Sequence, residues 1–393
     1  MKKIEAQIVA DSISPQGHRI TTFLLTFPRF ILAELNTHRM FSRNSASSRA
    51  IPFEKMVKMV QEDPFIPIAW QKDHKGMQGT EYITDATDWG SLDCCRMDWL
   101  QARYNAVYMA ESLHNLNVTK QLCNRLLEPF MWHTVLVTAT EFENFFELRC
   151  PKYQTPVSGK EFYFRSKKDC ITNHSDSQNI AKLEAMSFEE WQSINTSQAE
   201  IHIQALAEAM WDAINESTPK KLKAGEWHIP FGDNIQPGIV EYAEYYSNQG
   251  TKQIEYPSGK ILREGKSPEE SNLEFNIKVA TACCARLSYM TFDNKIDYEK
   301  DIQLHDMLLK EGHFSPFEHC ARTMSDLEYY SFIKGKYPTV RDGYGIINYE
   351  MMPISEDDTG LVGFKGVNPH NSDIYGWCNN FRGWVQYRYL IEN

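Results

Sequence analysis

The stretch from Glu34 to Pro52, ELNTHRMFSRNSASSRAIP, concentrates hydrogen-bonding side chains around a few apolar ones. Arg39, Arg43 and Arg49 lie within eleven positions of one another. A guanidinium group is suited to phosphate because it donates two parallel hydrogen bonds, and neighbouring serine and asparagine side chains would fix the orientation. The composition therefore indicates a binding loop for a phosphorylated ligand, although a solvated loop whose serines cap helices has the same composition.

The spacing of these residues carries more information than their composition. His38 and Arg39 are followed after seven residues by Ser47, with Asn44 between them and Arg49 two positions beyond Ser47. This pattern resembles the signature of the flavin-dependent thymidylate synthases, which reads R-H-R, seven residues, S, and contains N-E-x-S-x-R-Y. The corresponding segment here is NSASSRA.

Three positions depart from that signature, namely Thr37, Ser45 and Ala50. Thr37 removes a cation that family members place beside the flavin, and Ser45 removes a carboxylate near the nucleotide and flavin. Either Arg43, Lys120 or an insertion residue compensates for these losses, or another pyrimidine nucleotide is the substrate.

Further segments resemble the same family. PRFILAEL matches its P-x-F-V-x-x-Q-W segment with Glu34 in place of a glutamine, NRLLEPF places Arg125 on a phosphate-site arginine, and NFFELR supplies Asn144 and Arg149. A carboxylate such as Glu34 would repel a phosphate unless it is protonated or turned to another partner. The segment SQAEI resembles a family helix whose polar residues, including Glu200, we expect to be structural.

The order of the segments differs from that of the family. A family member begins with A-R-x-S-Y and G-H-x-S-P-F-E-H, but here CARLSY, which contains Ser288, and GHFSPFEH, which ends at His319, come last. Joining nearby surface termini changes connectivity without changing a packed core. We therefore expect an α+β protein with the flavin-dependent thymidylate synthase-like fold, an antiparallel sheet with long helices, in circularly permuted form.

The resemblance implies a role for each matched residue. Arg149 is the expected catalytic residue, because it would lie against the uracil ring and polarise its carbonyls as negative charge develops. The expected substrate-binding residues are Ser47, Arg49, Arg125, Arg149 and Glu34, and the expected flavin-binding residues are His38, Arg39, Asn44, Asn144, Ser288 and His319.

The implied reaction is the reductive methylation of dUMP to dTMP, with FAD as cofactor and with methylenetetrahydrofolate and NADPH as co-substrates. The flavin supplies the redox chemistry and the protein supplies binding and electrostatics. Family members are homotetramers whose sites draw residues from several subunits, so we expect the same assembly here.

Three alternatives stay open. A flavin enzyme that installs methyl or hydroxymethyl on dUMP or dCMP for modified DNA would have the same phosphate site. A non-catalytic nucleotide- or RNA-binding paralogue would keep the basic loop alone, which the retained flavin positions disfavour. A metal enzyme would use His305, His313, His319 and a cysteine such as Cys320, which are competent ligands, although their spacing matches no closed site.

These residues need elements that position them. From Arg19 a β-rich run shifts to helix formers after Pro28, which predicts a strand that passes into a helix. The serine-rich stretch from near Ser42 reads as a loop, and the region from about Asp98 to Asn124 reads as an amphipathic helix. The segment SFEEWQSINTSQAEIHIQALAEAMWDAI predicts a second such helix.

The later part of the chain suggests the domain organisation. We expect core residues in 1–217 with a long loop or insertion at 151–193, a bridging insertion at 218–272, a second core part at 273–325 and an extension at 326–393. The second core part would hold two helices, the last of which ends at Gly312. GEWHIPFGD in the bridge is distinctive, and its Trp227 or His228 could reach the active site.

Composition limits the class of protein. With 393 residues, 42% hydrophobic and 12% aromatic, the chain can bury a sizeable core. Its net charge of -11 disfavours DNA and membrane surfaces as partners, so an anionic ligand should be small. Nine cysteines without C-x-x-C spacing indicate reduced thiols, and the start of the chain lacks the apolar region of a signal peptide. We expect a cytoplasmic protein.

Overall fold

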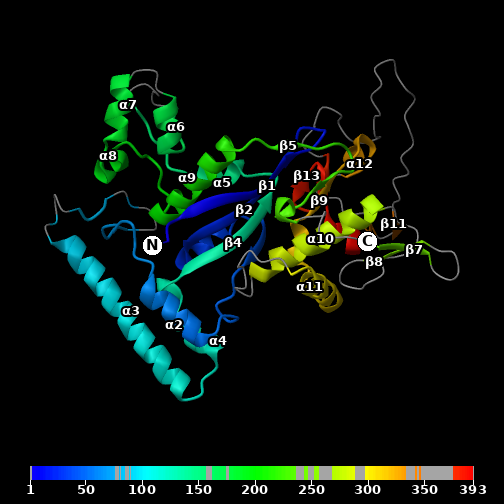
Figure 1. The fold of residues 1–393 in the computed structure, drawn as a ribbon. Helices are drawn as coiled ribbons and strands as arrows, with labels where there is room; N and C mark the ends of the chain where they lie inside the picture. Colours follow the sequence, from blue (N-terminus) through cyan, green and yellow to red (C-terminus); the bar gives the residue numbers. More distant parts are fainter. Residues whose placement is uncertain are drawn as a thin grey trace.

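A five-stranded sheet forms the centre of the protein (Figure 1). Its order is β3-β4-β2-β1-β5, and neighbouring strands are antiparallel except for the parallel pair β1 and β5. The strands are β1 Glu5–Ile13, β2 Arg19–Pro28, β3 Ser42–Ser45, β4 Trp132–Ala139 and β5 Lys220–Lys221. This computed structural model describes residues 2–75, 79, 81–84, 88, 90–155, 162–173, 177–235, 243–246, 252–255, 268–287, 297–332, 341–342, 345–346 and 375–392.

One face of this sheet is covered by α5 (Glu143–Arg149) and α9 (Ile201–Glu216). Because side chains alternate along a strand, Phe23 of β2 and Val137 of β4, which are paired across the strands, point to this face together. Both are fully buried with apolar side chains of α5 and α9. We call this the apolar face.

The opposite face packs against α10 (Pro268–Arg286), beside which runs α11 (Tyr298–Glu311). Leu24 and Leu136 contribute apolar contacts here, but their neighbours on the same face include the paired threonines Thr22 and Thr138. We call this the threonine face. As predicted, α11 ends at Gly312, whose φ of 74° is a left-handed conformation that glycine adopts without strain.

A second, three-stranded sheet joins distant parts of the chain. Its order is β14-β9-β6, from β14 (Trp384–Gln386), β9 (Ala321–Thr323) and β6 (Trp227–His228). One strand thus comes from the expected bridge, one from the second core part and one from the expected extension. The tail therefore pairs with the core, and Trp384 is fully buried.

A separate helical layer lies at one end of the sheet (Figure 1). It consists of α2 (Phe53–Glu62), α3 (Ser91–Asn115), α4 (Lys120–Cys123) and the 3-10 helix η2 (Asn124–Phe130). Buried side chains of α2, α3 and η2 form their own cluster. The predicted helix from Asp98 to Asn124 is thus confirmed as far as Asn115, but it begins earlier, at Ser91, and α4 and η2 follow it.

The structure corrects three other expectations. The predicted loop near Ser42 contains β3, because its backbone pairs with β4. The loop or insertion predicted at 151–193 contains two helices that were not predicted and, at its end, the first helix of the predicted helical segment; their small core includes Tyr153 and Trp191. The single helix expected around Gln198 is divided into α8 and α9. The chain between these helices is extended, and the side chain of Glu200 caps the start of α9. The three insertion helices are α6 Lys167–Thr172, α7 Ser177–Glu184 and α8 Phe188–Ser193.

The remaining described elements are short. The expected transition from strand to helix after Pro28 is confirmed by η1 and α1. The remaining short elements are η1 Arg29–Ile31, α1 Leu32–Leu35, η3 Gly232–Asn234, β7 Ala243–Tyr246, β8 Lys252–Glu255, η6 Ser315–Glu318, α12 Asp326–Ser331, β10 Arg341–Asp342, β11 Gly345–Ile346, β12 Trp377–Cys378, β13 Phe381–Arg382 and α13 Tyr387–Glu392.

The mixture of mainly antiparallel strands and helices confirms the predicted α+β class. Among the described residues, no helix has both the length and the apolar character needed to cross a bilayer. The proposed circular permutation and the domain boundaries stay predictions.

Candidate functional site

Arg149, the last residue of α5, is the centre of a polar cluster. Its Nε donates a hydrogen bond to His38 Nε2 at 3.2 Å, and its Nη1 lies 3.7 Å from Glu34 Oε2. The Arg149 side chain keeps 23% of its surface exposed, so the guanidinium retains donors for a ligand. Residues predicted from separate motifs, NFFELR and the signature stretch, are therefore in contact.

His38 is held in an aromatic pocket. Its ring stacks on Phe41 with a centroid distance of 5.8 Å and meets the edge of Phe145 at 4.9 Å. Burial, followed by the positive charges of Arg149 and Arg43, lowers the pKa of His38 to about 4. The ring is neutral at pH 7, and because Nε2 accepts from Arg149 its proton resides on Nδ1.

Arg43 lies on β3 beneath this cluster. Its Nη1 donates to the backbone carbonyl of Leu35 at 3.3 Å and contacts that of His38 at 3.5 Å. Burial lowers the pKa of Arg43, an effect that the nearby carboxylate of Glu318 opposes. Arg43 therefore holds the loop that carries His38 and adds positive charge behind it.

Glu34 is a half-buried carboxyl group beside Arg149. Burial and then the charge of Glu200 raise the pKa of Glu34, while Arg149 and His202 oppose the shift. The carboxyl group thus takes up a proton more readily than a free glutamate, which reduces repulsion toward an anionic ligand.

Glu200 and His202 form a second pair close to Glu34. The two side chains are hydrogen-bonded, and His202 Nε2 accepts a hydrogen bond from the backbone N–H of Ile68 at 3.0 Å. The expectation of a structural role fits the capping of α9 by Glu200. Its electrostatic effect on Glu34 was not predicted, because no local spacing relates residues 34 and 200.

Asn44 connects the signature stretch to the later core part. It is buried, and its Nδ2 donates to the carbonyl of Cys284, 240 residues away, at 3.3 Å. The 3-10 helix η6, which carries SPFE of GHFSPFEH, lies against β3 as well. CARLSY and GHFSPFEH thus meet the signature stretch in space, although Ser288 lies outside the described residues.

His319 follows η6 and is completely buried. Its Nδ1 lies 2.8 Å from the hydroxyl of Thr138 on β4. Its Nε2 is buried and has no hydrogen-bond partner among the described residues. Burial, and then the neighbouring His228, lower the pKa of His319 to about 3, so the ring is neutral.

The expected phosphate-binding residues share one supported surface. Asn124 of η2 is buried and donates to the carbonyls of Ser48 at 2.7 Å and Ile51 at 3.0 Å, and the Ser48 hydroxyl donates to Glu128 at 2.5 Å. These bonds fasten η2, which carries Arg125, to the segment that carries Ser47 and Arg49. Both arginines are exposed and Ser47 is half-buried.

Two expected flavin-binding residues are also exposed. Arg39 and Asn144 lie on the surface, and their side chains form no hydrogen bond or ion pair within the described parts of the chain. They are therefore free to bind a ligand, in contrast to the buried His38, Asn44 and His319. The expected residues therefore divide into a buried set and an exposed set.

The C-terminal segment contributes residues that no motif indicated. Asn380 Nδ2 donates to the carbonyl of Met40 at 2.8 Å and to the Ser42 hydroxyl at 3.1 Å, and Gln386 Nε2 lies 3.3 Å from that hydroxyl. These amides support the signature stretch from behind. An asparagine and a glutamine in an aromatic tail give no sequence signal of this role.

The described residues contain no arrangement of ligands that fits the metal-enzyme alternative. No group of three or more His, Cys, Asp and Glu side chains is placed there to hold a metal ion. His305 is instead within hydrogen-bond distance of Asp306 at 2.9 Å and of the Tyr387 hydroxyl at 3.2 Å.

Comparison with known proteins gives limited similarity. No protein family and no curated protein matches the chain in sequence. Solved structures that resemble it include a UMP/dUMP methylase, PolB from Streptomyces cacaoi, bound with 5-Br UMP; the TM-score is 0.36 at 16% identity, covering 55% of this chain and 90% of that one. PolB bound with 5-Br dUMP gives a TM-score of 0.37 at 14% identity, covering 55% and 91%.

Proposed function

We propose that this protein is a flavin-dependent methylase of a pyrimidine deoxynucleotide, with dUMP as substrate and dTMP as product. The observation that carries the proposal is the cluster in which Arg149, His38 and Glu34 from two distant motifs are in contact. Methylenetetrahydrofolate is the proposed carbon donor, and NADPH is the proposed reductant.

In this proposal the protein binds the nucleotide from both ends. Arg49, Arg125 and Ser47 hold the phosphate, and the fastening of η2 to the Ser48 region supports this role. Arg149 donates to the pyrimidine carbonyls and stabilises negative charge that develops on the ring. Neutral His38 keeps the guanidinium oriented by accepting at Nε2.

The described residues fit a flavin. His319 has a buried nitrogen without a partner in the described structure, Asn44 is an anchored amide, and Arg39 and Asn144 are exposed donors. FAD, held by these residues and by His38 and Ser288, would supply the redox chemistry. The protein's part is to orient the ring system and to exclude water from the buried side of the site.

The proposal includes a cytoplasmic homotetramer whose sites are completed by neighbouring subunits. Exposed apolar side chains on the long helix α3 support an assembly, because a helix of this length buries only Val107 and Ala110 in the described monomer. The exposed side chains are Met97, Tyr104, Tyr108 and Met109. Light scattering coupled to size-exclusion chromatography of the purified protein tests the subunit number.

The first test of function is the absorbance spectrum of the purified protein, followed by anaerobic reduction with NADPH with and without dUMP. A flavin spectrum whose bleaching or reoxidation responds to dUMP is the expected result. A flavin that ignores dUMP would overturn the substrate, and a colourless protein that fails to bind added FAD would favour the non-catalytic nucleotide-binding alternative.

Arg149→Ala separates nucleotide chemistry from cofactor binding. Loss of a donor that acts on developing charge should lower kcat about 100- to 1000-fold while FAD stays bound. The adjacent exposed Leu148→Ala is the matched control and should retain activity. Loss of flavin together with turnover in Arg149→Ala would contradict the assigned role.

Arg49→Ala tests the phosphate site. Removing a charge-assisted hydrogen bond should weaken dUMP binding about 10- to 100-fold. Lys58→Ala, which removes an exposed cation of α2, should leave the affinity unchanged. Equal dUMP affinity in Arg49→Ala and wild type would exclude this phosphate contact.

Glu34 favours a second candidate, a methylase or hydroxymethylase of dCMP. Its carboxyl group lies beside Arg149, where an ionised oxygen could accept a hydrogen bond from the exocyclic amine of cytosine. Product analysis with dUMP and dCMP side by side, in wild type and in Glu34→Gln, distinguishes the two substrates. Turnover of dCMP that is lost in Glu34→Gln would support this candidate.

A further inference from the structure

Five buried side chains on the threonine face form a continuous row. Ser12 Oγ lies 3.0 Å from His228 Nδ1, and His228 Nε2 lies 2.8 Å from Thr22 Oγ1. Thr22 Oγ1 lies 2.7 Å from Thr138 Oγ1, which lies 2.8 Å from His319 Nδ1. We call these five residues the buried relay.

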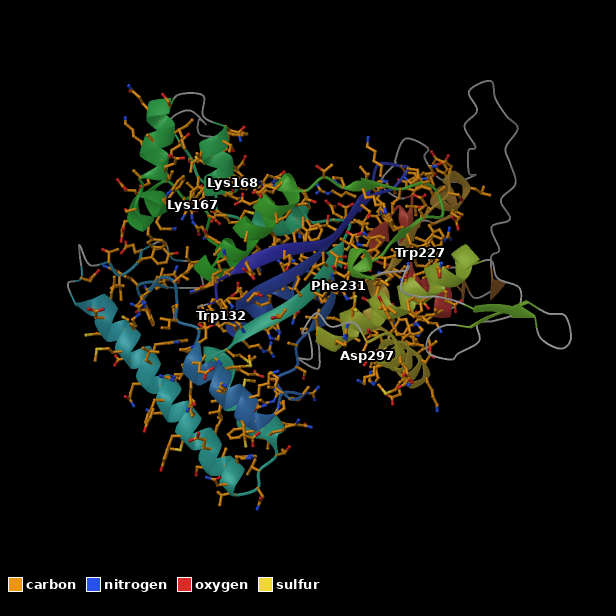
Figure 2. All side chains as sticks on the ribbon, viewed as in Figure 1. Trp132, Lys167, Lys168, Trp227, Phe231 and Asp297 are labelled. Carbon is orange, nitrogen blue, oxygen red and sulfur yellow. The ribbon has the colours of Figure 1, made fainter. Side chains whose placement is uncertain are left out.

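The buried relay is assembled from five separate segments. Its members come from β1, β6, β2, β4 and the chain after η6, and none is more than 5% exposed. His228 belongs to the distinctive GEWHIPFGD segment, and Figure 2 shows its neighbours Trp227 and Phe231 beside α10, where they pack in the apolar cluster of that face. Water is thus kept from the row, so its members satisfy one another.

Both imidazoles in the row are neutral at pH 7. Burial lowers the pKa of His228 and of His319 to about 3 in each case. A neutral imidazole has one N–H donor and one bare nitrogen acceptor, whereas each hydroxyl has a single proton to donate. The row therefore has a limited number of protons to share among its hydrogen bonds.

This limit makes the hydrogen bonds point in one direction. If Ser12 donates to His228 Nδ1, then His228 Nε2–H donates to Thr22, Thr22 to Thr138, and Thr138 to His319 Nδ1. His319 then carries its proton on Nε2. If the direction is reversed, His319 donates from Nδ1, its Nε2 is bare, and the Ser12 hydroxyl proton is left over.

The first direction leaves fewer groups unsatisfied. It uses every hydroxyl proton inside the row and leaves one buried donor, the Nε2–H of His319. The reverse direction leaves both a surplus hydroxyl proton at Ser12 and a bare Nε2 at His319. Each unsatisfied buried polar group is destabilising, so the direction with one such group is favoured.

We infer that Ser12, His228, Thr22 and Thr138 are positioning residues that fix the ring tautomer of His319, so that its buried Nε2–H is presented as a hydrogen-bond donor to an acceptor atom of the bound cofactor. The inference deepens the proposed function and rests on it for the identity of the ligand. It assigns a role to the GEWHIPFGD segment, because His228 transmits to Thr22 the direction that the Ser12 hydroxyl sets. The described geometry of the row itself does not depend on the ligand.

Solid-state NMR of the full-length protein labelled with ¹⁵N-histidine tests the relay directly, because protonated and bare imidazole nitrogens resonate separately. The twelve histidines require assignment, which His319→Gln and His228→Gln provide by difference. In wild type, His319 should have a protonated Nε2 and a bare Nδ1. A protonated Nδ1 on His319 would overturn the inference.

Ser12→Ala tests coupling along the whole row. It removes the donor to His228, so neither direction of the row is favoured. The ¹⁵N signals of the two His319 ring nitrogens should then shift toward their average, although Ser12 does not touch His319. Thr138→Val, which removes the direct contact, should also shift them. Unchanged His319 signals in Ser12→Ala would overturn the relay.

The matched control is Ser14→Ala. Ser14 is equally buried near the end of β1, but its hydroxyl accepts from the backbone N–H of His18 at 3.2 Å, outside the row. His319 signals in this variant should match wild type, and a shift as large as that of Ser12→Ala would contradict a specific relay. The NMR result needs no flavin, so a colourless protein with the expected His319 tautomer would reject the proposed function and retain the relay.

Discussion

The two faces of the central sheet differ in what they bury. On the apolar face, Phe23 and Val137 are paired across the strands and lie in a cluster of buried apolar side chains. The residues next to them on each strand, Thr22 and Thr138, are paired on the threonine face. Their hydroxyls hydrogen-bond each other and two histidines. The same two strands thus provide a stabilising core on one side and a polar, directional row on the other.

The difference shows how a strand can support a site without exposing it. Thr22 and Thr138 give no sequence signal of a buried polar role, because threonine is common in strands whichever way its side chain faces. In the fold, α10 and β6 cover this side, and the hydroxyls find partners inside the protein. Stability should therefore depend most on the apolar face, and the state of His319 on the threonine face.

Phe23→Ala should give the largest loss of stability. Truncating a fully buried phenylalanine removes apolar contacts and leaves a cavity, which costs about 3–5 kcal/mol in the free energy of unfolding. Urea unfolding measures the loss. Leu148→Ala, at an exposed leucine, should stay within about 0.5 kcal/mol of wild type. Equal effects of the two variants would contradict the apolar face as the main source of stability.

Thr22→Val should cost less, about 1–3 kcal/mol, because its shape is kept while buried polar partners lose a hydrogen bond. Thr138→Val should behave similarly. Because the two hydroxyls share one bond, the double variant should lose less than the sum of the single variants, as measured by unfolding in a double-mutant cycle. Strict additivity would argue against a connected row.

The pH dependence of stability should report the buried histidines. The pKa of His228 is about 3 in the folded protein, below its ordinary value near 6.5, so only the unfolded chain binds this proton between those values. Its contribution is present above pH 6.5 and is lost as the pH falls toward 3, at about 1.4 kcal/mol per pH unit for one proton.

His228→Gln should weaken the pH dependence of the free energy of unfolding by up to about 1.4 kcal/mol per pH unit, the contribution of one proton. Urea unfolding at pH 7, 6 and 5 measures this dependence. Thr323→Val is the control, because it removes a buried hydroxyl that bonds the carbonyl of Lys223 without removing a titrating group. A slope that is the same in His228→Gln as in wild type would mean that His228 takes up its proton in the folded state.

His133→Phe should have the smallest effect, with opposite sign. His133 lies on the apolar face next to Phe27, and neither ring nitrogen has a partner among the described residues. Replacing an unsatisfied polar ring with an apolar one should raise stability by up to about 1 kcal/mol at pH 7. The same change at His319 should lower stability, since Thr138 loses its partner. Thermal unfolding of both variants compares the faces, and destabilisation by His133→Phe would contradict this contrast.

Local patterns in the sequence predicted the elements that local physics decides. The strand from Arg19 follows from β-branched and aromatic residues, and the end of α11 follows from Gly312, whose left-handed conformation is costly for other residues. Helices α6 and α7 were missed because their segment is rich in polar and turn-forming residues, and a small shared core that includes Cys170, Leu183 and Trp191 holds them to α8.

Residues of the candidate site could be selected from the sequence where a motif contained them. Contact between Arg149 and His38, and the approach of η6 and Cys284 to β3, agree with the grouping of the motifs. The roles of Thr22, Thr138, Asn380 and Gln386 depend on pairings across hundreds of residues, which leave no spacing signal. The row that ends at His319 could therefore be found only in the fold.

The hydrogen bonds from Asn380 to Met40 and Ser42 also bear on the order of events during synthesis. These partners are about 340 positions apart in the chain, so the ribosome must make nearly all of the intervening protein before the contact can form. The signature stretch is made early and lacks the hydrogen bonds from Asn380 until that later segment has been translated. Closing so long a loop is slow, which leaves apolar surface open to chaperones in the interval. Assembly of the site is thus a late step, which is complete only after the segment around Asn380 has been made.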